Sequence, residues 1–440
     1  MFTYVKLNNF RSLNDVYFDL KETKEKTKRI AAIYGENGCG KSNLIRSFSF
    51  LKSLMHSFIT EKSEIKFNKI LSEKEANDFP PVILEMMKRN TVSEIYNSAR
   101  TIECDDNTTV EIGFEIDGRE GYYQIEFNEV IVYEKLYYYT GKQSGILYEI
   151  LNSEIKIPKL SSLIFKTAKI QNEFKERIEK YWGRHSMLAI CYEMINSFNL
   201  EYLNENISNY LFDFINMISD TAITIKEGRG GFAFESRKKI NFISDLDGGD
   251  ISIENEWLLT NTEIILNDFF TQTYSDIKKV YFETKKEGKR IKYKLMLYKN
   301  INNKVRLIPV EQESTGTRQI LEVLRNLFGA FCGCTVIIDE VDNGVHDLLL
   351  KVVIDSMRKY ITGQLIFTTH NTSLLESLEP KMVYVINGNY DGTKEIVCLS
   401  DYKIQDHNSA RVRYMKGLYG GIPFVEDVDY VEIINHLKQK

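Results

Sequence analysis

The sequence predicts an α/β protein with a mostly parallel sheet, an antiparallel β subdomain and an inserted α-helical lobe. Three observations lead to this prediction. Short apolar runs alternate with helical patterns from residue 315 onward, as in a parallel sheet covered on both faces. A glycine-rich loop separates an apolar run from a helical pattern near residue 35. Residues 110–139 alternate polar and apolar side chains, which is typical of antiparallel strands.

Length and composition set the limits of this prediction. A chain of 440 residues with 43% apolar residues can bury a large core, so we expect two or three parts: 1–149, 150–275 and 276–440. The formal net charge of −5 gives no overall positive field of the kind that marks many nucleic-acid-binding proteins. The six cysteines lack disulfide or metal-site spacing, and no apolar run is long enough for a signal core or a membrane span, so we expect a cytoplasmic protein.

The first 150 residues read as strand, loop and helix, followed by antiparallel strands. Strands are expected at residues 2–8 and 29–34, and the helical pattern "KSNLIRSFSFLKSLMHSFI" begins at Lys41. Later, "VEIGFEIDGREGYYQIEF" contains an Asp-Gly pair between two alternating runs, which predicts a hairpin.

The remaining chain changes character twice. Between 150 and 275 two long stretches have helical spacing, separated from later segments by the polar breaks "EGRGG" and "DLDGGD". Strands are then expected at 278–283, 291–299, 304–310, 335–340, 364–369 and 382–386, and helices at 315–331 and 348–361. The middle part is therefore predicted to be a helical insertion in an α/β fold.

The stretch "GENGCGKS", Gly35 to Ser42, fits a phosphate-binding loop. Glycines allow successive backbone N–H groups to converge on phosphate oxygens, Lys41 adds a positive charge near the outer phosphates, and the Ser42 hydroxyl can ligate Mg²⁺. The expected contacts also include Asn37, Gly38, Gly40 and Asn43. A plain glycine-rich turn is the alternative, but a strand before and a helix after the loop are the context that phosphate loops require.

Two carboxylates end the apolar run "TVIIDE". Parallel strands present their carboxyl ends at one sheet edge, where the phosphate loop also lies, so Asp339 can support Mg²⁺ and Glu340 can meet an attacking water. The run "LIFTTHN" ends in His370 at the same edge, where the imidazole can donate to a γ-phosphate. The alternatives are a solvated strand end and a structural histidine.

A second anion-binding feature is predicted at "ESTGTRQ". Ser314 precedes a helix as an N-cap, and Gly316 leaves backbone N–H groups exposed at the positive end of the helix dipole. One nucleotide rarely needs two helix N-termini. We therefore expect this helix to face the nucleotide of a second copy in a two-fold symmetric pair.

Together these motifs resemble the ABC-type ATPase heads of the SMC and RecF class, and in detail the OLD-like and abortive-infection ATPases. The resemblance rests on "NFRSL", "GENGCGKSN", "ESTGTRQILEVL", "IIDEVDNGVH", "IFTTHNTSLL" and "RVRYMKGLYGGIP". It covers roughly residues 1–55, 105–140 and 278–425, but not the helical middle. It implies a P-loop NTPase head of ABC type, which the insertion would divide into 1–149 and 276–440.

The resemblance implies a role for each matched residue. Lys41 and Ser42 would bind ATP and Mg²⁺, Asp339 would support Mg²⁺, Glu340 would activate water, and His370 would be the switch histidine. Ser314 and Gly316 would act as the signature motif in trans, and Asn343–Asp347 would contact the other copy. Arg11 has two open interpretations, reaching the nucleotide or capping the first strands.

The sequence departs from the family pattern in two places. No Gln loop can be assigned, because Gln124 lies in an alternating strand pattern. No TOPRIM nuclease domain fits after Pro423, and the short "DVD" at 427–429 and "DLD" at 245–247 are more typical of solvated loops. Any effector would then be a separate protein.

The predicted function is an ATPase that dimerises around ATP and controls a separate nuclease or toxin, with anti-phage defence as the role implied by resemblance. One alternative is a RecF-like repair ATPase that binds DNA, favoured slightly by "KKEGKRIKYK" at 285–294, although such charge runs are usually exposed hairpins. Another is a nucleotide-gated scaffold with little turnover. No membrane partner is expected.

Overall fold

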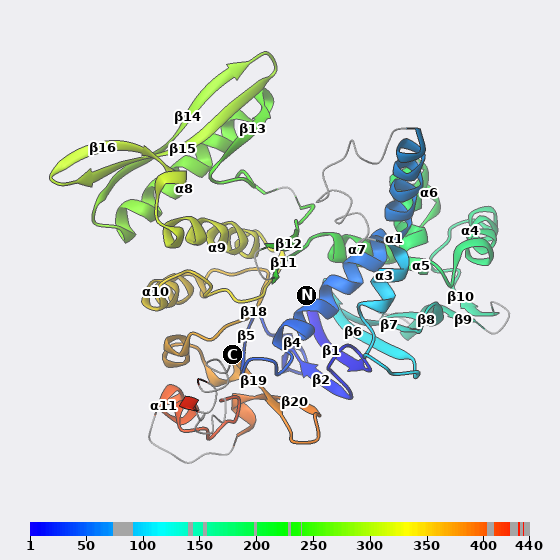
Figure 1. The fold of residues 1–440 in the computed structure, drawn as a ribbon. Coiled ribbons are helices and arrows are strands. Elements are labelled where there is room, and N and C mark those ends of the chain that lie inside the picture. Colours follow the sequence, from blue (N-terminus) through cyan, green and yellow to red (C-terminus); the bar gives the residue numbers. More distant parts are fainter. Residues whose placement is uncertain are drawn as a thin grey trace.

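The computed structural model describes most of the chain as two large sheets, a helical region and a projecting four-stranded lobe (Figure 1). It describes residues 1–73, 91–139, 144–152, 156–197, 200–227, 230–238, 240–402, 409–422, 430–431 and 434. Pro423 and the "DVD" run at 427–429 lie outside these residues. Within the described parts, no helix combines the length and apolar character needed to cross a bilayer.

The central sheet has the order β12-β11-β17-β18-β5-β19-β20. Its five inner strands run parallel, and an antiparallel strand closes each edge. The strands are β5 (Ile30–Gly35), β11 (Thr221–Glu227), β12 (Gly230–Phe234), β17 (Thr335–Ile338), β18 (Gln364–Thr368), β19 (Val383–Gly388) and β20 (Lys394–Cys398). Every residue of β5, β17 and β18 is buried, because helices cover both faces.

Alternation along β5 divides the core in two. Ala31 and Ile33 join the core beneath helix α1 (Lys41–Glu73), whereas Ile30 and Ala32 join the core beneath helix α9 (Thr315–Phe331). The α9 side also packs against α10 (Asp347–Met357). The predicted mixed, mostly parallel sheet with helices on both faces is confirmed.

The second sheet is antiparallel, in the order β10-β9-β8-β7-β6-β1-β2. The predicted hairpin is confirmed, because Ile116 pairs with Arg119 across a turn in which Asp117 and Gly118 both have positive φ. The strands are β1 (Phe2–Asn8), β2 (Val16–Asp19), β6 (Thr108–Ile116), β7 (Arg119–Phe127), β8 (Ile131–Tyr139), β9 (Ser144–Leu151) and β10 (Lys156–Leu160), beside a small pair, β3 (Lys21–Thr23) and β4 (Lys26–Thr27).

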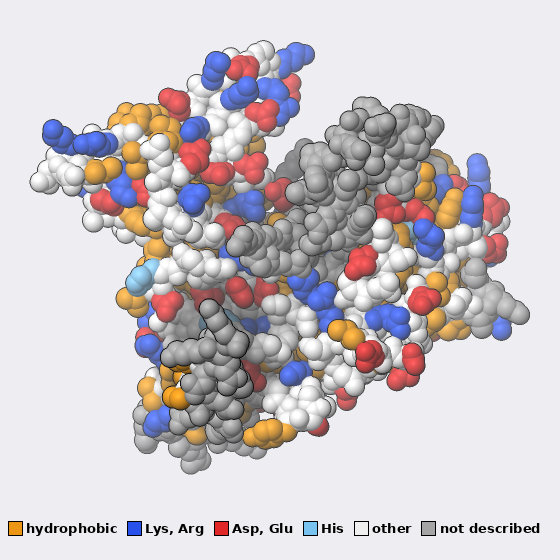
Figure 2. Space-filling model, in the orientation of Figure 1, with side chains coloured by type: hydrophobic (Ala, Val, Ile, Leu, Met, Phe, Trp, Pro, Cys, Tyr) orange, Lys and Arg blue, Asp and Glu red, His pale blue; other side chains and the backbone are white. Residues whose placement is uncertain are grey.

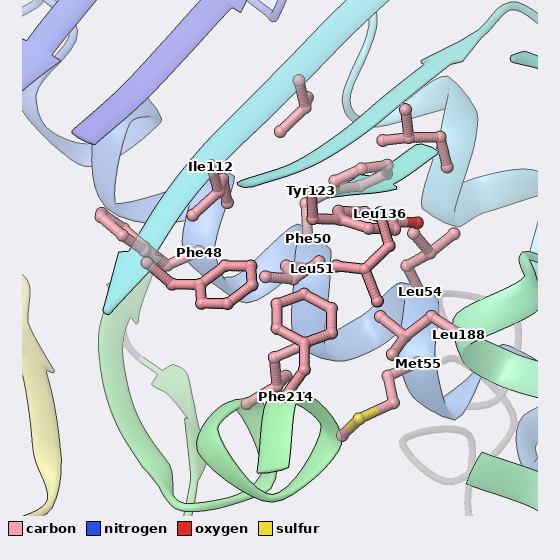
Figure 3. Packing of buried hydrophobic residues seen from close by; sticks show 14 of the residues in the cluster. Phe48, Phe50, Leu51, Leu54, Met55, Ile112, Tyr123, Leu136, Leu188 and Phe214 are labelled. Carbon is pink, nitrogen blue, oxygen red and sulfur yellow. The ribbon is translucent and has the colours of Figure 1, made fainter. Parts of the chain in front are cut away.

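Helices between residues 168 and 219 pack on α1 and on this antiparallel sheet. Figure 3 shows Phe48 and Leu51 of α1, Tyr123 of β7 and Phe214 of α7 directed into one apolar core. Burying one such phenylalanine stabilises the fold by roughly 1.5–3 kcal/mol. The helices are α4 (Ala168–Tyr181), α5 (Met187–Ser197), α6 (Leu200–Asn206) and α7 (Asn209–Ser219), with α3 (Val92–Asn97) against α1.

The range 150–275 holds more than the expected helices. Sequence analysis missed β11 and β12, which add to the edge of the central sheet through the parallel pairing of β11 with β17. Their short run, "TAITIKE", follows directly on α7 and is hard to separate from a helical pattern by periodicity. The chain therefore returns to the central sheet before the expected boundary at 275.

The projecting lobe contains β13 (Gly248–Ser252), α8 (Glu256–Thr273), β14 (Ile277–Glu287), β15 (Arg290–Ile301) and β16 (Lys304–Pro309). Strand β15 lies between β14 on one side and β13 and β16 on the other. Side chains of α8 protect the β14 edge, since Asn267 accepts from Val280 N–H and Glu263 accepts from Phe282 N–H. The strands predicted after residue 277 are confirmed.

Short elements complete the chain. They are the 3₁₀ helices η2 (Ile253–Asn255), η3 (Val310–Gln312), η4 (Thr372–Glu376), η5 (Pro380–Met382) and η6 (Leu399–Asp401), and the helix α11 (Ala410–Met415). The α11 region folds back on the central sheet, where Tyr414 packs against Tyr34 of β5. The carboxyl-terminal motif therefore lies beside the strand that leads into the phosphate loop.

Candidate nucleotide site

The glycine-rich loop connects β5 to α1, as predicted. Gly35, Gly38 and Gly40 all have positive φ. A Cβ at Gly35 would lie 2.6 Å from Cys39 Sγ and 2.8 Å from the Ile386 carbonyl oxygen, so this position requires glycine. Asn37 and Gly38 are exposed at the tip of the loop. The loop backbone is therefore accessible to a ligand at Asn37 and Gly38 and tightly packed at Gly35.

Lys41 is held inside this loop. Its Nζ donates to the carbonyl oxygens of Gly35, at 2.8 Å, and Glu36, at 2.9 Å, and the residue is 7% exposed. Burial lowers the pKa of Lys41, and this is partly opposed by Cys39 and by the carboxylates of Asp339 and Glu340. The ammonium group therefore lies within electrostatic reach of the acids that end β17.

The first turn of α1 contacts the amino-terminal motif "NFRSL". Arg11 donates to Asn43 Oδ1 at 3.4 Å, and Asn43 Nδ2 donates to Ser12 Oγ at 2.8 Å. The Arg11 backbone N–H also donates to the Ala99 carbonyl oxygen. The guanidinium group thus lies beside the helix start that carries half-buried Ser42, while the backbone of Arg11 ties two segments together, so both interpretations of Arg11 stay open.

The acids after β17 are fixed by the neighbouring strands. Asp339 is buried, and its Oδ1 accepts from Thr368 Oγ1 at 2.6 Å. The Asp339 N–H donates to Thr224 of β11, and the Glu340 N–H donates to Thr368 Oγ1 at 2.7 Å. Glu340 has φ of 52°, a left-handed conformation that costs free energy in a residue other than glycine. Such strain is typical of functional sites and directs Glu340 away from the regular path of the strand.

His370 follows β18 at the same sheet edge and is exposed. Burial lowers its pKa, and the positive charge of Lys41 lowers it further, whereas Asp342, Glu340 and Asp339 act in the opposite direction. The fold thus brings Lys41, Asp339, Glu340 and His370 together from three separate segments. Each segment follows a strand of the central sheet.

The predicted N-cap of α9 is confirmed, because Ser314 Oγ accepts from Thr317 N–H at 3.2 Å. Ser314 is exposed, while the preceding Glu313 is buried and bound by Lys299 Nζ, which lies 2.8 Å from both carboxylate oxygens. A Cβ on Gly316 would lie 3.2 Å from the Gly344 carbonyl oxygen. The signature-like segment therefore packs against the 343–347 loop of its own chain.

Gln124 lies in β7, and its side-chain amide donates to Glu126 Oε1. The strand interpretation of this residue is confirmed, so it supplies no Gln loop.

Sequence analysis missed three contributors to the site. Thr368 was part of the predicted strand, but its contacts with Asp339 and Glu340 gave no local signal. Asp342 lies within "IIDEVDNGVH", where the local sequence does not indicate its contact with the histidine loop. Gly421 packs so closely that its ideal Cβ would lie 3.3 Å from Gly35 Cα, and only the double glycine in "YGGIP" hinted at such an approach. The Gly421 carbonyl oxygen accepts from Tyr414, which fixes the segment.

Comparison with known protein families supports the interpretation of the chain as an ATPase. Residues 211–376 match the family described as "AAA domain, putative AbiEii toxin, Type IV TA system". Together with the fold, this match confirms the predicted resemblance to AAA and ABC-type ATPases and supports an ATPase of that broad kind. No protein with a curated description matches the chain by sequence.

Solved structures of SMC heads are also similar to the chain. The head domain from Thermotoga maritima has 15% identity and a TM-score of 0.39, over 90% of this chain and 98% of its own. An SMC head bound to the carboxyl-terminal winged-helix domain of ScpA has 13% identity and a TM-score of 0.43, over 90% and 97%. A Pyrococcus furiosus SMC head bound to the ScpA carboxyl-terminal domain has 13% identity and a TM-score of 0.42, over 95% and 98%.

Proposed function

We propose that the chain binds ATP with Mg²⁺ at the carboxyl edge of the central sheet and hydrolyses it slowly. The observation that carries this proposal is the convergence of Lys41, Asp339, Glu340 and His370 at one edge. Nucleotides bind at this edge in open α/β sheets. Phosphoryl transfer needs positioning and charge stabilisation more than covalent chemistry, and these are the groups that can supply both.

Each residue has a proposed task. The loop backbone and Lys41 hold the phosphates, and Glu340 orients and deprotonates the attacking water. His370, uncharged near neutral pH because its pKa is lowered, donates one hydrogen bond to the outer phosphate.

Mg²⁺ would be held through the Ser42 hydroxyl and the Asp339 carboxylate, both oxygen donors of the type this ion prefers. The buried position of Asp339 fits this role. Among the described residues no three His, Cys, Asp or Glu side chains converge as a metal site, so nucleotide oxygens would complete the coordination. When bound, the ion neutralises charge on the phosphates.

The proposal includes pairing of two copies around ATP. Ser314 caps the 17-residue helix α9, and Gly316 lies in its first turn. Ser314 is exposed, so backbone N–H groups at the positive helix end can reach the nucleotide of a second copy. The loop Asn343–Asp347 packs beside Gly316 and would join the same contact. Pairing would then depend on nucleotide at both sites.

We further propose that pairing controls a separate effector protein, a nuclease or toxin, in anti-phage defence. The part between the two head segments, 150–275, would be the sensor or partner surface. Helices α5 and α7 of this part pack along α1, which begins at the phosphate loop. Lys52 of α1 also donates to the carbonyl oxygens of Ser219, Thr221 and Glu235, so a shift of α1 would be transmitted to the segments after α7.

DNA binding is the second candidate function, and one observation favours it. Residues 277–309, which form three of the four strands of the projecting lobe, contain eleven Lys and Arg but two Glu in a chain whose net charge is −5. Figure 2 shows Lys and Arg side chains at both ends of this lobe. Several are already paired, such as Lys292 with Glu287 and Arg290 with Asp250. These ion pairs reduce the charge left for phosphates.

The test is the mass in solution of a Glu340→Gln variant with and without Mg-ATP, run beside a pull-down from its native operon's products. Because this variant would bind ATP without hydrolysing it, we expect the mass to double with ATP and a second protein to be retained. Glu129→Gln, an exposed position between β7 and β8 and outside the proposed partner surface, is the control for the loss of one negative charge.

Other outcomes change the conclusion. Retention of DNA alone would favour the repair function. A normal turnover rate in Glu340→Gln would show that another group activates water. A mass that does not respond to ATP would overturn nucleotide-dependent pairing, and tight ATP binding without turnover by the unmodified chain would favour the nucleotide-gated scaffold.

A further inference from the structure

The loop that follows Glu340 contains a carboxylate to which the proposed reaction gives no task. Asp342 lies two residues after Glu340 and is half-buried. Its surroundings differ from those of an ordinary loop aspartate in two respects. One oxygen accepts a hydrogen bond from another loop of the site, and the other is enclosed without a hydrogen-bond partner among the residues that the structure describes.

The first oxygen binds the histidine loop. Asp342 Oδ2 accepts from the His370 backbone N–H at 3.0 Å, a contact between residues 28 positions apart. Further bonds join the same segments. Among them, Asn371 Nδ2 donates to the Asp347 carbonyl oxygen at 2.9 Å, and Val341 N–H donates to the Thr368 carbonyl oxygen at 3.1 Å. The Asp342 contact is the one that reaches His370 itself, and it therefore fixes where that residue's backbone lies.

The second oxygen of Asp342, Oδ1, is enclosed in an unusual way for a charged carboxylate. Asp342 Oδ1 is enclosed by protein and has no hydrogen-bond partner among the described residues. An enclosed carboxylate oxygen without a hydrogen-bond donor costs free energy, so its presence in a folded protein needs a physical explanation. The negative charge of Asp342 also acts on two neighbours. It raises the pKa of Lys41, which burial lowers, and it adds to the rise that burial causes in the pKa of Tyr34.

We propose that Asp342 is a positioning residue of the nucleotide site, with a separate task for each oxygen. Oδ2 holds the His370 backbone in place, and Oδ1 is the acceptor for a hydrogen-bond donor that arrives with Mg-ATP. Binding of nucleotide then satisfies an enclosed acceptor and draws the loops after β17 and β18 together. This inference rests on the proposed ATPase function for the second task, but not for the first.

The alternative is a loop aspartate that only stabilises the fold. Asp391 is a suitable control of that kind, because it is exposed and its Oδ1 accepts from the Thr393 backbone N–H at 2.9 Å within a turn. Asp342→Asn keeps an oxygen for the His370 N–H and places an amide N–H₂ where Oδ1 was. Asp342→Ala removes both groups. The three variants Asp342→Asn, Asp342→Ala and Asp391→Asn therefore separate the two tasks from each other and from simple stabilisation.

The first measurement is hydrogen exchange of the His370 amide in the nucleotide-free protein. We expect exchange to become about tenfold faster in Asp342→Ala and to remain close to the unmodified rate in Asp342→Asn and Asp391→Asn, because only the alanine lacks an acceptor. Unchanged exchange in Asp342→Ala would overturn the first task. This result does not depend on ATPase activity.

The second measurement is steady-state ATP hydrolysis. We expect kcat to fall about tenfold or more in both Asp342 variants, with KM changed by less than about threefold, and no change in Asp391→Asn. An unchanged kcat in Asp342→Asn would overturn the second task. Asp342 would then only hold the His370 backbone through Oδ2. If the unmodified protein hydrolyses no ATP, the proposed function fails and the second task with it, while hydrogen exchange still decides the first.

Discussion

Replacing Glu134 by alanine should destabilise the junction between the antiparallel sheet and the helices that follow it. This side chain lies on β8, is 0% exposed and accepts five hydrogen bonds. Its Oε1 accepts from the Tyr123 and Tyr148 hydroxyls at 3.0 and 3.1 Å and from the Leu188 N–H at 3.3 Å. Its Oε2 accepts from the Trp182 indole and the Met187 N–H, both at 2.7 Å.

The number of donors sets the expected cost. Burial raises the pKa of Glu134, and the hydrogen bonds from Met187 and Trp182 oppose that rise. A buried donor left without an acceptor costs about 1–3 kcal/mol. A water entering the space left by the carboxylate could accept from two of the five donors. We therefore expect Glu134→Ala to lower the free energy of unfolding by about 3–5 kcal/mol.

The assay is urea unfolding followed by tryptophan fluorescence, which is suited to this site because Trp182 itself binds Glu134. Glu149→Ala on the adjacent β9 is the matched control, since Glu149 is half-exposed and accepts from Tyr133 at 2.7 Å, and about 1 kcal/mol or less is expected there. If Glu134→Ala cost no more than Glu149→Ala, the reasoning from buried, unpaired donors would be refuted.

Two further predictions concern the site, and a third concerns two histidines that contact later turns of α1. Lys41→Ala should weaken ATP binding roughly 100-fold or more by calorimetry, and unchanged affinity would remove the phosphate-loop assignment. Ser314→Arg should prevent the ATP-dependent mass increase while ATP still binds the single chain, and normal pairing would end the role in trans. Burial lowers the pKa of His56 and His185, so the unfolded chain binds more protons near pH 6 and stability should fall as pH drops below about 6.5. A flat urea midpoint between pH 7.5 and 5.5 would contradict this.

Local chemistry explains how much of the site the sequence predicted. Glycines with positive φ, a lysine and a serine between a strand and a helix form a contiguous motif, and its conformation is largely set by the residues within it. The cap at Ser314 is equally local, because its partner Thr317 is three residues away. The ends of β17 and β18 could be placed at one edge, since parallel strands leave no other arrangement.

Other features required the tertiary structure because they join residues that are distant in the sequence. Strand β11 carries a short apolar run that is compatible with a helix or a strand. It forms a strand because it pairs with β17, more than a hundred residues later in the sequence. Asp342 and His370 each sit in a recognisable motif, yet their hydrogen bond depends on how two loops pack.

The sequence by itself thus determined which chemical groups the site contains and which strand ends carry them, because motif spacing and strand direction are local properties. Only the tertiary structure decided how those groups are held. Thr368 fixes both acids, Gly421 closes on Gly35, and Asp342 holds His370 while its other oxygen has no hydrogen-bond partner in the described part of the chain. These contacts depend on distances between separate segments, which no single stretch of sequence specifies.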